Sequence, residues 1–139
     1  MKKRIPISRI MTKNVVTLHT KDDLATAEEI FKKKRIRHLP ITSGERIIGM
    51  LSHTDLMRIS FADTTDVSEQ QIDTTVYNMF TIAQIMAKNV ITVSPKDTIQ
   101  EVATFLTKKE FHALPVVDNN KLVGIVTTTD LINYFLDQY

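Results

Sequence analysis

The sequence contains no cysteine and no tryptophan among its 139 residues. The lack of cysteine excludes a disulfide scaffold, a zinc–thiolate site and a thiol nucleophile. Aromatic residues make up only 6% of the chain, and the net charge of +2 is too small to argue for nucleic-acid binding. A nucleic-acid binder therefore remains an alternative that rests only on the sequence pI of about 8.9.

Long apolar runs are also missing. No run approaches the roughly 20 residues that a membrane span requires. The basic start, Met1 to Arg4, is followed by Pro6 and polar residues instead of the apolar segment of a signal peptide. With 42% apolar residues, the chain has an ordinary composition for one compact globular unit. By default we expect it in the cytoplasm.

The chain repeats itself at an offset of 75 residues. Residues 7–11 match residues 82–86, and the match continues without a gap to Leu56 and Leu131. A gapless match of this length indicates a duplicated unit. The identical pairs include Met11/Met86, Asn14/Asn89, Thr17/Thr92, Asp22/Asp97, Leu39/Leu114, Pro40/Pro115, Gly49/Gly124 and Asp55/Asp130.

Each half predicts a strand, a helix, two strands and a second helix. We expect the first helix to begin at a cap on Thr20 with Asp23 in its first turn, and on Ser94 with Pro95 at the first helical position. A proline in the second strand of each half argues for a sheet edge or a strand start. The predicted strands are 15–18, 39–41 and 47–51, and 90–93, 114–117 and 122–126.

The junction between the third strand and the last helix carries the candidate chemistry. It spans residues 49–56 in the first half and 124–131 in the second. A helix start offers N–H groups and the positive end of the helix dipole to a phosphate, and a carboxylate accepts hydrogen bonds from ribose hydroxyls. Ser52-x-x-Asp55 and Thr127-x-x-Asp130 also fit capping boxes, which stabilise a helix without any ligand. Both roles remain open.

The tandem repeat, the Ile-Met openings, the Leu-Pro-Ile and Leu-Pro-Val strands and the Gly-x-x-(Ser/Thr)-x-x-Asp endings resemble a pair of cystathionine-β-synthase (CBS) domains, or Bateman module. The resemblance covers residues 7–56 and 82–131 and suggests a stand-alone module. It implies a mixed α/β (α+β) fold of two β-α-β-β-α repeats related by a pseudo-twofold axis, with the sheets packed together and the helices outside. The implied division is 1–60 for the first repeat, 61–81 for a connector and 82–139 for the second repeat.

The resemblance also implies a function. CBS pairs commonly bind adenosine-containing ligands, such as AMP, ADP, ATP or S-adenosylmethionine, in clefts between their halves, and they often form flat homodimers. The ligand would be regulatory, as in energy sensing, and no cofactor would be required. The module would signal to an unidentified regulated protein, with neither nucleic acid nor membrane as a partner. The two clefts need not be equivalent, since Ala113 replaces His38 in the second half.

The family's site residues carry over by position. The resemblance implies ribose contacts from Asp55 and Asp130, phosphate contacts from Ser52, Thr54, Thr127 and Thr129, and an adenine sandwich from Val16, Ile36, Ile91 and Phe111. It also implies a polar position that often faces phosphate at Arg37 and His112, followed by His38 in the first half.

Other readings of these residues are weaker. The HExxH, GxSxG, P-loop and GxGxxG patterns are missing, so we expect neither a metal site nor enzymatic activity. The main alternative is a ligand-free dimeric scaffold whose pocket is plugged by a long side chain such as Phe111 or Arg37. The basic run 32–35 fits a solvated helix end. The role of the connector remains open, although it carries a possible helical stripe of Val67, Ile72, Val76 and Met79.

Overall fold

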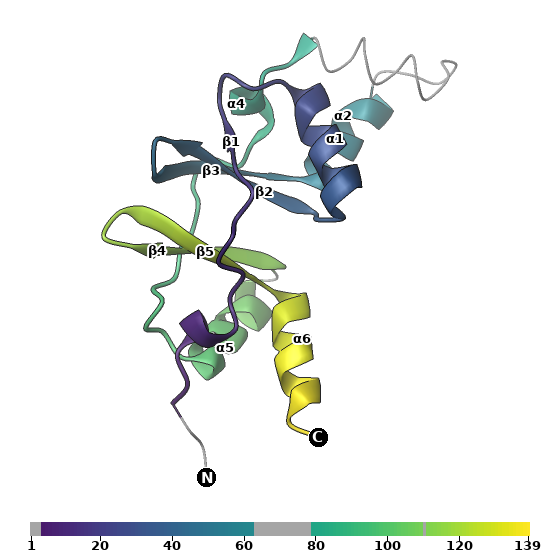
Figure 1. The fold of residues 1–139 in the computed structure, drawn as a ribbon. Helices are drawn as coiled ribbons and strands as arrows, with labels where there is room; N and C mark the ends of the chain where they lie inside the picture. Colours follow the sequence, from purple (N-terminus) through teal and green to yellow (C-terminus); the bar gives the residue numbers. More distant parts are fainter. Residues whose placement is uncertain (1–3, 63–78, 110) are drawn as a thin grey trace. The chain divides into compact units, whose positions relative to one another are not determined.

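The computed structural model describes residues 4–62, 79–109 and 111–139 (Figure 1). Its elements confirm a mixed α/β chain. The first repeat has the predicted order β1, α1, β2, β3 and α2, and the second has α5, β4, β5 and α6 without the strand predicted at 90–93. The described elements are η1 (Ile7–Arg9), β1 (Leu18–His19), α1 (Leu24–Lys34), β2 (His38–Ser43), β3 (Arg46–Ser52), α2 (His53–Ala62), α4 (Ile82–Ile85), α5 (Ile99–Lys109), β4 (Ala113–Asp118), β5 (Lys121–Thr127) and α6 (Thr128–Asp137).

The chain folds into two compact units that do not coincide with its repeats. The first-repeat unit comprises Val16–Val90, and the second-repeat unit comprises Ile91–Tyr139 together with Met1–Val15. We call residues 7–15 and 82–90 the openings of the first and second repeats. The opening of each repeat therefore belongs to the unit of the other repeat. The predicted division into 1–60, 61–81 and 82–139 was drawn along the repeats, whereas the compact units divide the chain after Val15 and after Val90. Most of the connector, with the stripe positions 67, 72 and 76, lies outside the described residues.

The first-repeat unit contains a three-stranded sheet in the order β1-β2-β3. The antiparallel β2–β3 hairpin turns at Gly44, whose φ of +63° is the left-handed conformation that glycine adopts without a steric cost. β1 pairs in parallel with β2, with Leu18 opposite Ile41. In Figure 1, α1 and α2 lie side by side. The buried core consists of Leu18, Leu24, Ala27, Phe31, Leu39, Ile41, Leu51, Leu56 and Ile82.

The second-repeat unit follows the same plan. A hairpin joins β4 to β5 through Asn119 and Asn120, with φ of +51° and +67°, which asparagine tolerates better than most residues. In place of a first strand, Val93 forms one parallel bridge to Val116, the pair displaced by 75 residues from that of β1 and β2. The buried core consists of Ile7, Val102, Leu106, Leu114, Val116 and Val126.

The first strands are shorter than predicted, and the prolines explain why. Val93 donates its N–H to the Pro115 carbonyl (3.0 Å) and accepts from the Val117 N–H (2.9 Å). A longer parallel strand would next need an N–H from Pro115, which proline lacks. Of the two predicted placements, the sheet edge is wrong for β2, which lies between β1 and β3 with Pro40 buried. Pro40 is the third residue of the strand, which agrees with the predicted strand start. The missing N–H of Pro40 likewise ends the pairing of β1 on the N-terminal side of Leu18.

The first helix of each repeat begins later than predicted. In α1 the cap is Asp23, whose Oδ1 accepts from the Thr26 N–H at 2.8 Å. The predicted cap region forms a separate turn, in which Asp22 Oδ2 accepts from the His19 N–H at 2.8 Å. Two capping-type turns therefore follow one another, and the second begins the helix.

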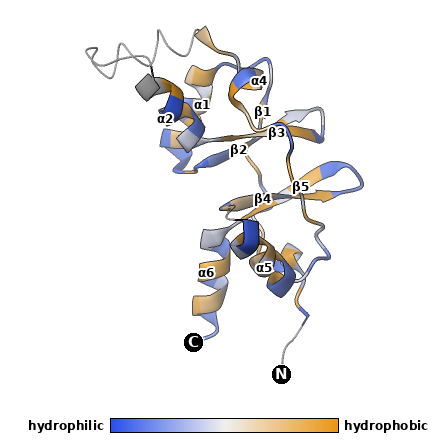
Figure 2. Cartoon of the chain, turned by 180° about the vertical axis from the view of Figure 1, so that it is seen from behind, coloured by the Kyte–Doolittle hydropathy of each residue, from blue (hydrophilic) through white to orange (hydrophobic). Residues whose placement is uncertain are grey.

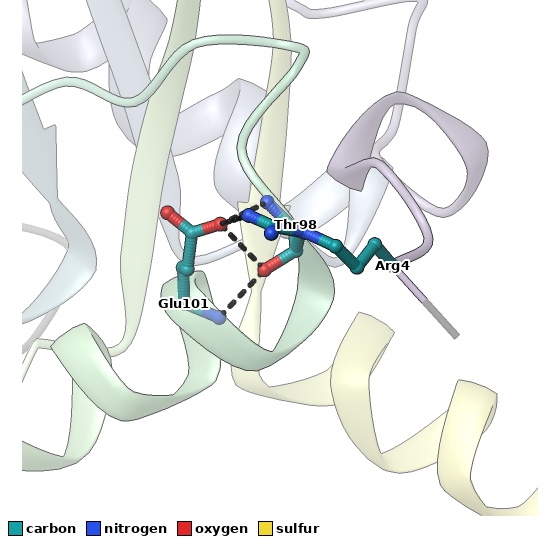
Figure 3. Close-up of polar contacts among 3 residues, drawn as sticks. All are labelled: Arg4, Thr98 and Glu101. Atoms are coloured by element: carbon teal, nitrogen blue, oxygen red, sulfur yellow. Dashed lines mark hydrogen bonds and ion pairs between the residues drawn. The ribbon is translucent and has the colours of Figure 1, made fainter. Parts of the chain in front are cut away.

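In the second repeat, Thr98 and Glu101 form the cap of α5 (Figure 3). Thr98 Oγ1 accepts from the Glu101 N–H (3.1 Å), and its hydroxyl donates to Glu101 Oε1 (2.8 Å). Arg4 lies 3.9 Å from the same carboxylate. The predicted start at Pro95 is wrong, because the preceding turn closes on Asp97, which accepts from the Ser94 N–H at 2.8 Å.

Each opening is fastened by a buried isoleucine and a pair of backbone hydrogen bonds. Ile7 and Ile82 are both 0% exposed. Thr12 and Ile125 exchange bonds of 2.8 and 3.0 Å, and Met50 and Ala87 exchange bonds of 3.0 and 2.8 Å. The opening of the second repeat also forms α4, whose first turn is held by a capping box of its own.

The first repeat's opening is held by additional bonds. Ile7 donates to the Asp97 carbonyl (2.7 Å), Ser8 donates to the Pro95 carbonyl (3.2 Å), and Ile99 donates to the Ile5 carbonyl (2.9 Å). Among the described residues, the opening of the second repeat makes no counterpart of these three bonds. The two openings are therefore unequal in how firmly they are held.

A glycine in the third strand of each repeat lies under a methionine from an opening. A Cβ atom built on Gly124 would lie 2.6 Å from Met11 Sδ and 3.0 Å from the Thr12 carbonyl oxygen. The three atoms nearest a Cβ atom built on Gly49 would be Sδ, Cγ and Cε of Met86. Glycine at these two positions therefore permits the close approach of the openings.

Candidate functional site

The last helix of each repeat begins with a reciprocal capping box, which confirms the capping interpretation. Ser52 Oγ accepts from the Asp55 N–H (3.1 Å), and Asp55 Oδ2 accepts from the Ser52 N–H (2.9 Å). Thr127 and Asp130 make the same two bonds at the same distances. Each aspartate therefore uses one carboxylate oxygen to hold its own helix.

The second carboxylate oxygen differs between the repeats. Asp55 Oδ1 lies 3.7 Å from Arg58, a mostly exposed ion pair that contributes little to stability. Within the described residues, Asp130 Oδ1 has no hydrogen bond or ion pair, and Asn133 occupies the position that matches Arg58. Sequence reasoning missed Arg58, although its i,i+3 spacing from Asp55 was a usable signal. Asp130 Oδ1 is therefore an acceptor that the described residues leave unused.

The predicted polar residues before the second strand lie beside these helix starts. The His53 N–H donates to the Arg37 carbonyl (2.8 Å), and the Thr128 N–H donates to the His112 carbonyl (3.0 Å). Arg37 and His112 are both exposed. His38 is half-buried and lies opposite Ser52 in the β2–β3 ladder. The structure therefore brings these residues together with the capping box of their own unit.

The helix starts retain donors that the caps do not use. Thr54 and Thr129 are the second residues of α2 and α6, and both are exposed. The bonds described above use the N–H groups before and after them. The second N–H of a helix has no intrahelical acceptor. Each repeat thus presents a backbone N–H and a threonine hydroxyl where the helix dipole favours an anion.

The apolar candidates are placed differently in the two units. Val16 and Ile36 are half-buried and pack against the core of the first-repeat unit. Ile91 and Phe111 are 42% and 39% exposed, and the Phe111 ring centroid lies 6.4 Å from that of Phe105. Ile91 and Phe111 are therefore more accessible than their counterparts in the first-repeat unit.

Two of the four residues in the basic run at the end of α1 form ion pairs on their own helix. Lys32 forms an ion pair with Glu28, and Lys33 lies 2.8 Å from Glu29. The hydrogen bond to Glu29 raises the pKa of Lys33. All four residues of the run are exposed, which agrees with a solvated helix end.

Two further searches concern the described part of the chain only. There, no three His, Asp or Glu side chains come together as a metal-binding group. None of the helices in these ranges combines the length and hydropathy that crossing a bilayer requires.

The sequence family follows from the repeats. A family model of the CBS domain matches residues 7–62 and 82–137. The chain belongs to the CBS-domain family. The CBS-domain pair of protein MJ0100, crystallised with 5′-methylthioadenosine and S-adenosyl-L-methionine, resembles this CBS pair with a TM-score of 0.82 and 27% identity, over 99% of this chain and 100% of that chain.

Other relatives of this CBS pair are much longer. A homoserine O-acetyltransferase of Methanococcus vannielii is 30% identical over 129 residues, which are 91% of this chain and 24% of the relative. An L-aspartate semialdehyde sulfurtransferase of Methanocaldococcus jannaschii is 29% identical over 131 residues, 93% of this chain and 23% of the relative. The chain spans about a quarter of these enzymes, so their activities do not transfer to it.

Proposed function

We propose that this CBS-domain pair is a regulatory module that binds an adenosine-containing ligand and signals its occupancy to a partner protein. The helix start of α6 carries the proposal, because Asp130 caps the helix with one oxygen and keeps the other for a ligand. The MJ0100 pair, which matches this chain from end to end, holds two adenosyl ligands. A ligand shifts such a module only by its different affinities for two arrangements.

The second-repeat site is the tighter one in this proposal. Asp130 Oδ1 would accept from the ribose hydroxyls, and Ile91 and Phe111 would contact the adenine ring. The matching oxygen of Asp55 is shared with Arg58. A hydrogen bond from a ribose hydroxyl to the charged Asp130 would contribute about 1.5–3 kcal/mol. At Asp55 a ligand would also have to displace or share Arg58, whose exposed ion pair is weak, so we expect the first-repeat site to be only somewhat weaker.

The ligands of the two sites would differ in phosphate content. Arg37 lies exposed beside the start of α2, where a cation and a helix dipole both favour a phosphate. His112 takes the matching place beside α6, so that site suits an adenosyl group such as S-adenosylmethionine. AMP, ADP or ATP would favour the first-repeat site. Such metabolites agree with the expected cytoplasmic location. On the basis of the family resemblance, we also propose that the chain forms a homodimer and acts on a regulated protein.

Isothermal titration with AMP, ADP, ATP and S-adenosylmethionine tests the proposal. We expect Asp130→Ala to raise the Kd of S-adenosylmethionine at least tenfold, about 1.4 kcal/mol. Asp55→Ala should leave this Kd nearly unchanged and weaken nucleotide binding instead. Glu101→Ala is the matched control, because it breaks the α5 capping box, which resembles that of α6 and carries no predicted site residue (Figure 3).

A ligand lacking the ribose 2′-hydroxyl separates ribose contact from helix capping. The 2′-deoxy ligand should bind the wild type more weakly than its parent, but both should bind Asp130→Ala equally. If none of the four ligands binds with a Kd below about 1 mM, or if Glu101→Ala weakens binding as much as Asp130→Ala, the proposal is wrong.

A further inference from the structure

A methionine sulfur packs each opening against the third strand of the other unit's sheet. Outside the adjacent residues, the atom nearest a Cβ built on Gly49 is Met86 Sδ, and the atom nearest one on Gly124 is Met11 Sδ. Each sulfur therefore fills the space that a side chain would take on the strand. In Figures 1 and 2, α4 at the start of the second repeat's opening lies beside β3, the strand that contains Gly49.

A thioether in this position is open to a specific chemical change. Met11 and Met86 are half-buried, so we expect a small oxidant to reach them in the folded chain. When hydrogen peroxide reacts with a thioether, a sulfur lone pair forms the S–O bond and the O–O bond breaks. The transferred oxygen gives its proton to the leaving hydroxide, which becomes water; sulfur is oxidised and the peroxide is reduced. The product is a sulfoxide, which is polar where the thioether was apolar.

The N–H groups that join the second repeat's opening to β3 are already used. Met50 donates to the Ala87 carbonyl at 3.0 Å, and Ala87 donates to the Met50 carbonyl at 2.8 Å. The Met86 N–H donates to the Ile82 carbonyl at 2.9 Å. The Met86 side chain packs against the apolar core of the first-repeat unit. A sulfoxide oxygen held there without a hydrogen bond is unfavourable, and it gains one when the opening moves into water.

Met86 is the more sensitive of the two methionines, because less else holds its opening in place. Three additional backbone hydrogen bonds hold the first repeat's opening, which contains Met11. Within the part of the chain that the structure describes, the second repeat's opening lacks counterparts of these three bonds. Loss of the Met86 contact would leave that opening held mainly by the buried Ile82 and by the two bonds of Ala87.

We propose that Met86 is a reversible oxidation site, at which a hydroperoxide forms the sulfoxide and the sulfoxide releases the second repeat's opening from β3. That strand ends at Ser52, which caps α2, so the released segment lies next to the first-repeat site along the strand. The oxidation site is defined without any ligand. Binding tests on the candidate site and oxidation tests on Met86 can therefore fail independently of each other.

Hydrogen exchange of the full chain, before and after treatment with hydrogen peroxide, tests this proposal. Peptide mass spectrometry shows which methionines have gained oxygen. We expect oxidation of Met86 to speed exchange of the Ala87 amide by about tenfold or more. The Thr12 amide should respond by a smaller factor, even where Met11 is oxidised as well. Treatment with a methionine sulfoxide reductase should restore the original rates.

Three variants identify the responsible sulfur. Met86→Leu keeps an apolar side chain of similar volume without sulfur, so peroxide should leave its Ala87 exchange unchanged. Met79→Leu is the matched control, because Met79 is 65% exposed and should oxidise readily without holding the opening. Its Ala87 amide should respond to peroxide as in the wild type. Met86→Gln places a polar group in the same position and should show the faster exchange without peroxide.

Four results would each overturn the proposal. Faster Ala87 exchange in peroxide-treated Met86→Leu would assign the effect to another methionine. Unchanged exchange in the wild type with Met86 fully oxidised would show that the opening accommodates the sulfoxide. Oxidation of Met86 only after the circular dichroism spectrum shows unfolding would mean that the folded chain protects the sulfur. Exchange that stays fast after the reductase has removed the oxygen would indicate damage instead of a reversible change.

Discussion

Adding one methyl group to each of the two buried strand glycines tests how the openings are held. Gly124→Ala places a Cβ atom 2.6 Å from Met11 Sδ and 3.0 Å from the Thr12 carbonyl oxygen. That oxygen cannot retreat freely, because it accepts from the Ile125 N–H at 3.0 Å. The three atoms nearest a Cβ atom on Gly49 all belong to the flexible side chain of Met86. We therefore expect Gly124→Ala to be the more destabilising change.

The magnitudes follow from two opposing effects. Overpacking a tight site costs about 1–3 kcal/mol. Replacing glycine with alanine also lowers the conformational entropy of the unfolded chain, which stabilises the folded state by about 0.4–1 kcal/mol. Because methionine has three rotatable bonds and adapts readily, Gly49→Ala should cost about 1 kcal/mol or less. Gly124→Ala should cost about 2–3 kcal/mol.

Urea denaturation of both variants measures this difference, which should appear as midpoints about 1 M apart. A double-mutant cycle supplies the control. Met86→Ala should relieve most of the cost of Gly49→Ala, whereas Met11→Ala should relieve only part of the cost of Gly124→Ala, since the backbone contact remains. Equal costs for the two glycines, or full relief by Met11→Ala, would refute the reasoning.

Three further predictions follow. In hydrogen exchange, the Ala87 amide should exchange at least tenfold faster than the Thr12 amide, because the second repeat's opening has fewer bonds; equal rates would contradict this. Asp23→Ala should cost about 1 kcal/mol at pH 7. Hydrogen bonds from Thr26, first from its side chain and then from its backbone N–H, lower the pKa of Asp23. Its contribution is therefore present above the unfolded pKa of about 4 and is lost as pH falls through the folded value. Urea midpoints of variant and wild type should converge at about pH 2, and a constant difference would refute the assignment. Ile7→Ala should cost about 2–5 kcal/mol and increase exchange first in α5, whereas Ile82→Ala should do so first in α1; exchange rising first in the other helix would contradict the unit assignment.

The duplicated pattern was the most informative part of the sequence. The offset of 75 predicts matched hairpins, matched helix starts and matched sheet registers, and the bridge of Val93 to Val116 repeats the pairing of Leu18 to Ile41. Turn residues and apolar periodicity act over a few residues, so local sequence reveals them. The capping boxes of α2 and α6 were predicted for the same reason.

Features decided by competition or by distant contacts were not predictable in this way. Two acidic residues, Asp22 and Asp23, can each accept a backbone N–H, and only the folded chain shows which one begins α1. No local pattern shows that Ile7 is buried with the second repeat. The ion pair of Arg58 with Asp55, which makes the candidate sites unequal, depends on side-chain placement. Ligand contacts by the thirteen candidate residues remain predictions.

The exchanged openings have a consequence for how such a chain can arise. A polypeptide carrying a single repeat would have a vacant groove where the isoleucine of the other repeat lies. Two such half-length chains would fill both grooves if the N-terminal segment of each chain bound to the other chain, which would give an intertwined dimer. Joining the two chains end to end turns that concentration-dependent assembly into one covalent molecule. Removing either half would then leave the groove of the remaining half without its isoleucine.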